Sequence, residues 1–149
     1  MTEYLLKTGN KVVATLRKPE AISDLTARYP STQLLVVKVD VTNKADITAA
    51  FSKVEEVFGR IDVVFNNAGA SFAAEIESID EADARDMFEV NFWGAARVTQ
   101  EAVRFFREVN KPVGGRLLQV SSRLGLIGVA ANGFYSASYV QSSTLITVH

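Results

Sequence analysis

The chain of 149 residues has no cysteine, one histidine and three prolines. Without cysteine, disulfides, cysteine-based zinc sites and thiol nucleophiles are excluded. No apolar run approaches the roughly 20 residues needed to span a membrane, and the N-terminus lacks the basic start and long apolar core of a signal peptide. We therefore expect a cytoplasmic protein, with an organelle matrix as the other option.

Positive and negative residues nearly balance, since the formal net charge is −1. Nothing in this balance indicates nucleic acid or an anionic membrane as a partner. The apolar fraction of 48% and the charged fraction of 22% are those of a soluble globular protein. The length allows one domain with a real core.

Four short apolar runs predict strands, at residues 12–16, 34–39, 61–65 and 116–120. They are continuous rather than alternating, which fits strands buried on both faces of a parallel sheet. The helix-like segments are residues 2–8, 19–29, 43–58 and 80–109. Strands alternating with helices predict right-handed βαβ units and hence an open, doubly wound α/β sheet of the Rossmann-like kind.

The segment 80–109 has the clearest helical pattern. Ser78 and Glu81 have the S-x-x-E spacing of a capping box at its start. One face carries Ala84, Phe88, Asn91, Ala95, Val98, Ala102 and Phe105. Asn91 interrupts this apolar face, and a buried amide needs hydrogen-bond partners. It either ties down a neighbouring loop or holds a water or a catalytic group.

Polar residues follow the second and third predicted strands, where an open α/β sheet binds its ligands. "NNAG", residues 66–69, comes directly after the third strand, and the small Ala68 and Gly69 let a flat ligand approach the backbone. The same letters also suit an ordinary turn. Asp40, in "VDV" at 39–41, either accepts a hydrogen bond from an adenine amino group or starts the loop before the next helix.

Basic residues follow the first predicted strand, in "ATLRKP" at 14–19. Dinucleotide-binding folds often place an acid near this point for the ribose hydroxyl of NAD, whereas a basic residue favours the 2′-phosphate of NADP. Leu16, Arg17 and Lys18 occupy the region here. Alternatively, Arg17 is a solvated loop residue.

The stretch "LLQVSSRLGLIGVAANGFYSAS", residues 117–138, carries the strongest signal. A strand ends in Ser121 and Ser122, and Tyr135 follows Ser122 by thirteen residues across a glycine-rich, nearly uncharged loop. Each feature alone is ordinary, since serines often end strands and tyrosines often stand near helix starts.

Four motifs occur together in a specific order and spacing: "NNAG", "EVNFWGA", "VSS" and "YSAS". In this combination the chain resembles the short-chain dehydrogenases/reductases, from about residue 2 to Ser138. The resemblance implies hydride transfer between a nicotinamide cofactor and a small carbonyl or alcohol. It implies that Ser122 polarises the substrate carbonyl, that Tyr135 is the general acid or base, and that Asn91 holds a water in the proton relay.

The resemblance also implies a cofactor site without a metal. Its residues would be Arg17, Asp40, Val41, Asn66, Ala68, Gly69 and Tyr135. The basic residues after the first strand make NADP the expected cofactor, ahead of NAD. In this family the long helix commonly packs against another subunit, so we expect a homo-oligomer through residues 80–109.

Two departures from the family pattern stand out. None of the nine glycines forms the family's phosphate-binding turn, T-G-x-x-x-G-x-G, and Tyr139 stands where the family has the lysine of Y-x-x-x-K. That lysine lowers the tyrosine pKa by its positive charge. From Leu124 to His149 there is no charged residue, and the last stretch makes a poor helix.

These departures predict a partial dinucleotide-binding domain at residues 1–138 and a divergent tail at 139–149. The first strand with its glycine-rich turn and the C-terminal strands would be absent, as in a fragment of a longer enzyme. The alternative is a non-catalytic relative that acts through subunit association. The substrate stays unidentified, because the family's substrate-binding segments lie largely after Tyr135.

Overall fold

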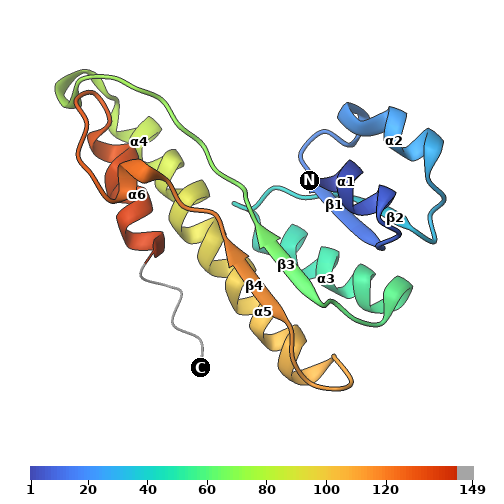
Figure 1. The fold of residues 1–149 in the computed structure, drawn as a ribbon. Coiled ribbons are helices and arrows are strands. Elements are labelled where there is room, and N and C mark those ends of the chain that lie inside the picture. Colours follow the sequence, from blue (N-terminus) through green and yellow to red (C-terminus); the bar gives the residue numbers. More distant parts are fainter. Residues whose placement is uncertain (144–149) are drawn as a thin grey trace.

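The structure is a computed structural model and describes residues 1–143, in which parallel strands alternate with helices (Figure 1). The strands are β1 (Val12–Leu16), β2 (Leu34–Lys38), β3 (Val63–Asn66) and β4 (Arg116–Gln119). The α-helices are α1 (Thr2–Lys7), α2 (Ser23–Arg28), α3 (Lys44–Phe58), α4 (Glu81–Phe88), α5 (Ala95–Glu108) and α6 (Gly133–Ser143). The short 3-10 helices are η1 (Pro19–Ile22), η2 (Ile76–Ser78) and η4 (Arg123–Gly125), and η3 (Glu89–Gly94) is a π-helix. All four predicted strand positions are confirmed.

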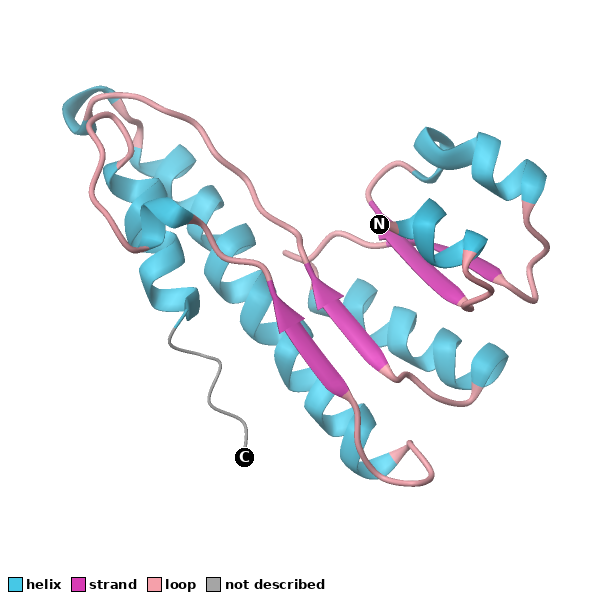
Figure 2. Ribbon diagram, in the orientation of Figure 1, coloured by secondary structure: helices cyan, strands magenta, loops and turns pink. Residues whose placement is uncertain are grey.

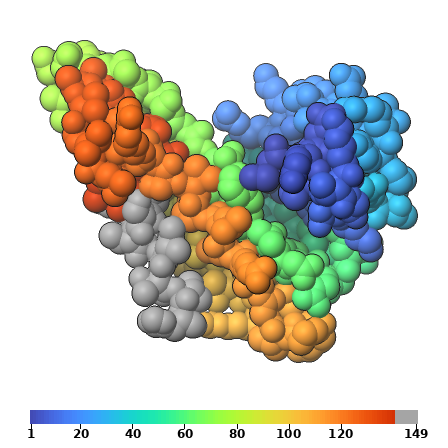
Figure 3. Space-filling view, viewed as in Figure 1, coloured from blue at the N-terminus to red at the C-terminus, as the bar shows by residue number. Residues whose placement is uncertain are grey.

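The described strands form two separate parallel sheets (Figure 2). β1 pairs with β2, with Val12 opposite Leu34, and β3 pairs with β4, with Val63 opposite Arg116. β1 and β3 therefore do not pair with each other, and each leaves one edge without a ladder partner among the described strands. The predicted α/β class with an incomplete parallel sheet is confirmed. In Figure 3 the N-terminal part, in blue, and the C-terminal part, in orange, form two lobes.

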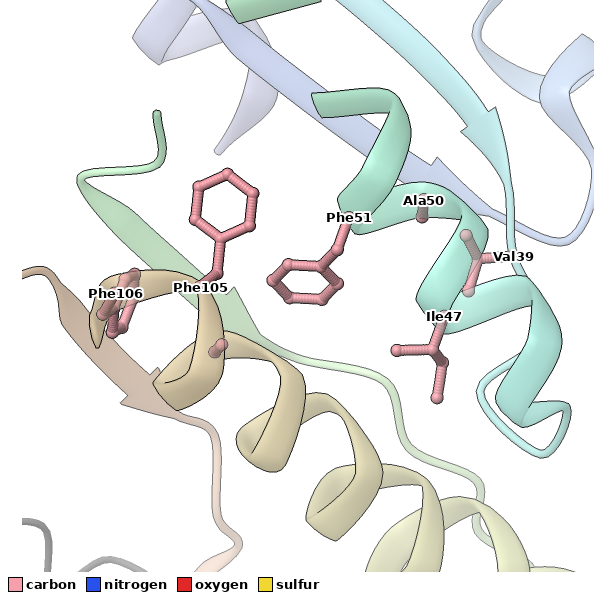
Figure 4. Close-up of a cluster of buried hydrophobic side chains, with 7 residues drawn as sticks. Val39, Ile47, Ala50, Phe51, Phe105 and Phe106 are labelled. Carbon is pink, nitrogen blue, oxygen red and sulfur yellow. The ribbon is translucent and has the colours of Figure 1, made fainter. Parts of the chain in front are cut away.

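The larger core joins the two sheets through α3 and α5 (Figure 4). Phe51 of α3 and Phe105 of α5 meet with ring centroids 5.9 Å apart. Val37 of β2 and Val64 of β3 both pack against this cluster. A second, smaller cluster of Leu6, Val12 and Leu34 lies between α1 and the β1–β2 sheet. Helix α3 is therefore the element that connects the N-terminal strands to the rest of the molecule.

The apolar face predicted for residues 80–109 is confirmed, since five of its seven residues are buried. The predicted capping box is wrong. Asp80 is the N-cap and accepts from the Ala82 amide at 2.9 Å, whereas the Ser78 hydroxyl donates to the carbonyl of Glu75, the residue before η2. A short aspartate directly before the helix satisfies its free amides as well as serine would. The helix also widens into the π-helical η3, a local irregularity that often marks a functional site.

The C-terminal helix differs from the prediction for residues beyond Tyr139. α6 continues from Tyr139 to Ser143, so the expectation of a poor helix is wrong there. Tyr139 itself is buried, and this packing supports a helix that propensity alone does not favour. The remaining residues of the predicted tail, 144–149, lie outside the described part. No helix in the described part is long and apolar enough to cross a membrane.

Candidate active site

The predicted site residues stand at or just after the carboxyl ends of the strands. Asn66 is the last residue of β3, and Ser122 follows β4 by three residues. On the other sheet, Arg17 follows β1 and Asp40 follows β2 by two residues. Paired strands run parallel, so within each sheet these residues gather at one edge, where open α/β sheets bind ligands.

Asn91 connects three segments of the C-terminal half. Its Nδ2 donates to the Ala70 carbonyl and to the Ser138 hydroxyl, both at 2.9 Å. Its Oδ1 accepts from the Ala70 amide at 2.8 Å. The residue is 2% exposed. Of the two alternatives from the sequence, this geometry corresponds to the loop tie, because both ends of the amide bind protein atoms.

Ser138 extends this connection to the tyrosine. Its hydroxyl accepts from Asn91 and donates to the Tyr135 carbonyl at 2.7 Å, and the residue is fully buried. Asn91 in η3 thereby fixes the backbone at Tyr135 near the start of α6. The sequence argument missed Ser138, although its place three residues after Tyr135 puts it on a neighbouring face of the helix.

The first asparagine of the "NNAG" loop is buried and anchors the loop by hydrogen bonds. Asn66 is buried, and its Nδ2 donates to the Ala95 carbonyl at 3.0 Å and to Gln119 Oε1 at 2.8 Å. This amide therefore fixes the end of β3 against α5 and β4. Ala68 and Gly69 are exposed, and a Cβ on Gly69 would collide with the Tyr139 hydroxyl. The loop thus presents backbone, and no bulky side chain, next to α6.

Tyr135 and Tyr139 pack together on α6, with ring centroids 4.9 Å apart. Burial raises the pKa of Tyr139, and the negative charge that Tyr135 acquires on ionisation and its hydrogen bond act in the same direction. Ser122 caps η4, accepting from the Leu124 amide at 3.2 Å. The hydrogen bonds of the described residues include none between Ser122 and Tyr135. Both are half-buried in the same region, because α6 packs against η4.

The loop after β2 is built around Asp40. Its Oδ1 accepts from the Thr42 amide at 3.0 Å and from the Thr42 hydroxyl at 2.8 Å. These bonds hold the pKa of Asp40 below its usual value, and the charge of Arg17 contributes in the same direction. Arg17 and Asp40, predicted for the adenine-ribose end of a dinucleotide, are therefore close enough to interact. Arg17 itself is exposed.

Two contacts join this loop to the π-helical segment. Val41 packs on Gly94, where an added Cβ would lie 2.8 Å from Val41 Cγ2. Arg97 Nη1 donates to the Thr42 carbonyl at 3.3 Å and pairs with Glu89 at 2.9 Å. No sequence signal pointed to Arg97, because its partners lie 8 and 55 positions away.

An open parallel α/β arrangement with polar residues at the strand ends is that of the doubly wound, Rossmann-like folds. The family model for the short chain dehydrogenases matches residues 1–145, so the chain belongs to the short-chain dehydrogenase family. Members of this family generally use a nicotinamide dinucleotide and act on small molecules.

Individual relatives agree with this assignment. The chain is 38% identical to the oxidoreductase calM of Penicillium decumbens over 133 residues, covering 87% of this chain and 43% of that protein. It is 37% identical to an uncharacterized oxidoreductase of Schizosaccharomyces pombe, again covering 43% of that protein and 89% of this chain. A short-chain dehydrogenase structure from Streptomyces avermitilis superposes with a TM-score of 0.88 at 31% identity, covering 97% of this chain and 52% of that one. The chain thus spans about half the length of these relatives.

Proposed function

We propose that this chain belongs to an NADP(H)-dependent oxidoreductase that interconverts a small carbonyl compound and its alcohol. One observation carries the proposal. The "NNAG" loop and the start of α6, which carries Tyr135, are tied together by the buried Asn91. α6 in turn packs on η4, which Ser122 caps. Three segments far apart in the sequence thus bring a polar serine, a phenol and an exposed backbone loop into one region.

The roles follow from the chemistry of these groups. Tyr135 would give its proton to the carbonyl oxygen in reduction and take it back in oxidation. Ser122 would orient the same oxygen by a hydrogen bond. Asn91, with its amide already engaged by Ala70 and Ser138, would hold Tyr135 and the loop in register. A relay water at Asn91, as the family resemblance implies, stays a prediction.

The residues at the other sheet fit NADP(H). Arg17 and Lys18 are exposed cations after β1, and a 2′-phosphate gains charge-assisted hydrogen bonds from such groups. Asp40 and Val41 would line the adenine, and Asn66, Ala68 and Gly69 would line the nicotinamide side through their backbone. The cofactor, when bound, supplies the hydride. The chain's own residues would transfer the proton, orient the carbonyl and position the cofactor.

The pyrophosphate of a dinucleotide needs backbone amides at a glycine-rich helix start. Among the described residues no glycine forms such a turn between a strand and the next helix; Gly9 follows α1 and Gly59 caps the end of α3. We therefore place the activity in a longer form of the protein that carries this turn. We expect the 149-residue chain alone to lack carbonyl reductase activity and to have no micromolar affinity for NADPH.

Association through the long helix is a second candidate function. Trp93 on η3 is 50% exposed, and its ring packs edge-on against Phe92 at 4.9 Å. Tryptophan is enriched among the residues that contribute most to protein–protein interfaces, so a half-exposed tryptophan on this helix suits packing against another protein. A homo-oligomer through residues 80–109 therefore stays a proposal. A cytoplasmic location stays a prediction.

The proposed function is tested by supplying the missing segments on both sides. A chimaera would carry a first strand with a T-G-x-x-x-G-x-G turn before this chain and the C-terminal segments of a short-chain dehydrogenase of known structure after Ser138, with Lys at position 139. Carbonyl-dependent NADPH oxidation is expected, and Tyr135→Phe should abolish it while leaving NADPH binding nearly intact. Turnover unchanged by Tyr135→Phe would show that another group transfers the proton.

Cofactor choice is tested in the same chimaera. Arg17→Ala should weaken NADPH binding more than NADH binding, because only NADPH carries the 2′-phosphate. Arg107→Ala, which removes an exposed arginine at the end of α5, is the matched control and should change neither. Equal losses for the two cofactors would contradict the role of Arg17.

A further inference from the structure

Arg97 joins three segments through one nitrogen atom. It is the third residue of α5, and its Nη1 donates to Glu89 Oε2 at 2.9 Å and to the Thr42 carbonyl at 3.3 Å. A terminal guanidinium nitrogen carries two hydrogens, so one nitrogen can serve both acceptors. Glu89 begins η3, and Thr42 belongs to the loop that follows β2. The arginine therefore connects the start of α5, the start of η3 and this loop.

The ion pair of Arg97 is partly shielded from solvent. The Arg97 side chain is 26% exposed and that of Glu89 is 41% exposed. Among the ion pairs of the described residues, no other cation is as little exposed. Fully exposed pairs contribute little to stability, and a shielded cation is less screened by salt. This pair is therefore suited to hold a segment in place.

An apolar contact lies next to this hydrogen bond. A Cβ on Gly94 would lie 2.8 Å from Val41 Cγ2, so Val41 lies directly against the backbone of η3. Val41 also packs on the core cluster that contains Phe105. Arg97 binds the carbonyl of the next residue, Thr42. Two adjacent loop residues are thus fixed to the same helix, one by packing and one by a hydrogen bond.

The other side-chain hydrogen bonds of the loop are local. Asp40 accepts from the amide and the hydroxyl of Thr42. Asp46 of α3 accepts from the Asp40 amide at 3.0 Å and from Asn43 Nδ2 at 2.9 Å. These partners lie within six positions of one another, so they shape the loop on α3 and do not connect it to η3. In the described part, that connection by a side-chain hydrogen bond comes from Arg97.

We propose that Arg97 is a positioning residue that holds the loop 40–43 on η3 and so sets where the adenine end of the cofactor lies relative to the catalytic groups. The adenine role of Asp40 and Val41 is that of the proposed function, on which this inference rests. A loop that is already held in place loses less freedom when a ligand binds to it, so its affinity for the ligand is higher.

This role is separate from that of the hydrogen bonds around Asn91. Asn91 binds Ala70 and Ser138, and neither partner contacts Arg97 by a hydrogen bond. Loss of Arg97 should therefore loosen the loop 40–43 and leave the segments around Asn91 unchanged. A general contribution of Arg97 to stability would instead affect both places.

The test is hydrogen exchange of the 149-residue chain, measured by NMR at two amides. The Thr42 amide is hydrogen-bonded within the loop, and the Ala70 amide donates to Asn91. Arg97→Met removes the donors and should accelerate exchange at Thr42 about fivefold, the size that loss of one hydrogen bond gives, with no change at Ala70. Arg107→Met, at an exposed arginine in the last turn of α5, is the matched control and should change neither rate. An unchanged rate at Thr42, or equal acceleration at both amides, would overturn the proposal.

Two further variants change the same hydrogen bond. Arg97→Lys keeps a positively charged donor and should restore part of the protection at Thr42. Glu89→Gln removes the charge of the second acceptor and should accelerate exchange at Thr42 by a smaller factor, about twofold. Circular dichroism shows whether each variant is folded; if Arg97→Met is not, Glu89→Gln decides. Exchange as fast in Arg97→Lys as in Arg97→Met would show that the donor does not hold the loop.

Cofactor binding tests the consequence for function. In the chimaera described above, Arg97→Met should raise the KM for NADPH about fivefold and change kcat by less than about twofold, because the groups that transfer the proton are not touched. A lower kcat at unchanged KM would contradict a role at the adenine end. An inactive chimaera would count against the proposed function alone, since the exchange measurement needs neither cofactor nor turnover.

Discussion

The two sheets of the molecule are held in different ways. The buried polar residues of the described part are Asn66, Asn91, Asn110 and Ser138, and all of them belong to the half that contains β3 and β4. The half that contains β1 and β2 has an apolar cluster around Leu6, with ion pairs on its surface. The β3–β4 half thus has buried side-chain hydrogen bonds in addition to its apolar core, whereas the β1–β2 half is held by a small apolar cluster.

This difference matches the proposed division of labour. Buried polar networks rigidify a structure when every member is satisfied. The hydrogen bonds around Asn91 reach α6, which carries Tyr135, and α6 packs on η4, which Ser122 caps. In the other half, Asp40 is held by the adjacent Thr42, and Arg17 is exposed. We infer that the proposed catalytic groups are preorganised, whereas the residues proposed for the adenine end are positioned more loosely.

Stability should fall most when the apolar core that joins the two halves, between α3 and α5, is truncated. Phe105→Ala removes a fully buried ring that packs on Phe51 of α3, and such truncations cost about 3–5 kcal/mol. Chemical denaturation should show this loss, and both halves should lose hydrogen-exchange protection. Phe65→Ala, at a residue 41% exposed, is the control and should cost less than half as much. Equal costs would show that α3 and α5 do not form the joint core.

Breaking the network should weaken one half only. Asn91→Leu leaves both backbone groups of Ala70 and the Ser138 hydroxyl without this partner, and we expect a cost of about 3 kcal/mol. Exchange should accelerate around residues 66–70 and in α6, with little change in β1 and β2. Asn67→Leu, at an exposed asparagine of the same loop, should change stability by less than about 0.5 kcal/mol. Equal acceleration of hydrogen exchange in both sheets would contradict the claim that the hydrogen bonds of Asn91 stabilise only the β3–β4 half.

The N-terminal half should respond to a change in its apolar cluster. Leu6→Ala should cost about 2 kcal/mol, near the low end for buried leucines, because the short helix α1 can move inward to fill part of the space. Exchange should accelerate in β1 and β2 and not around Asn91. Leu126→Ala, at a leucine 80% exposed, is the matched control. Stability unchanged by Leu6→Ala would mean that the cluster contributes nothing.

The sequence predicted the features that depend on local patterns. Continuous apolar runs identified the strands, and the three-and-four spacing identified the buried face of the long helix with Asn91 on it. It could not choose between the alternatives for Asn91, because Ala70 and Ser138 lie 21 and 47 positions away. It misplaced the helix cap, since Ser78 and Asp80 are both good caps, and it missed the end of α6, where packing of Tyr139 outweighs weak propensity.

The Ala70 amide gives the most direct test of a preorganised catalytic half. This amide lies in an exposed loop and donates at 2.8 Å to the buried Asn91 Oδ1. In the wild-type chain its hydrogen exchange should be slowed by a factor on the order of 100 relative to an unstructured alanine, and Asn91→Leu should remove that protection. Exchange of the Ala70 amide at the unprotected rate in the folded wild-type chain would contradict the account.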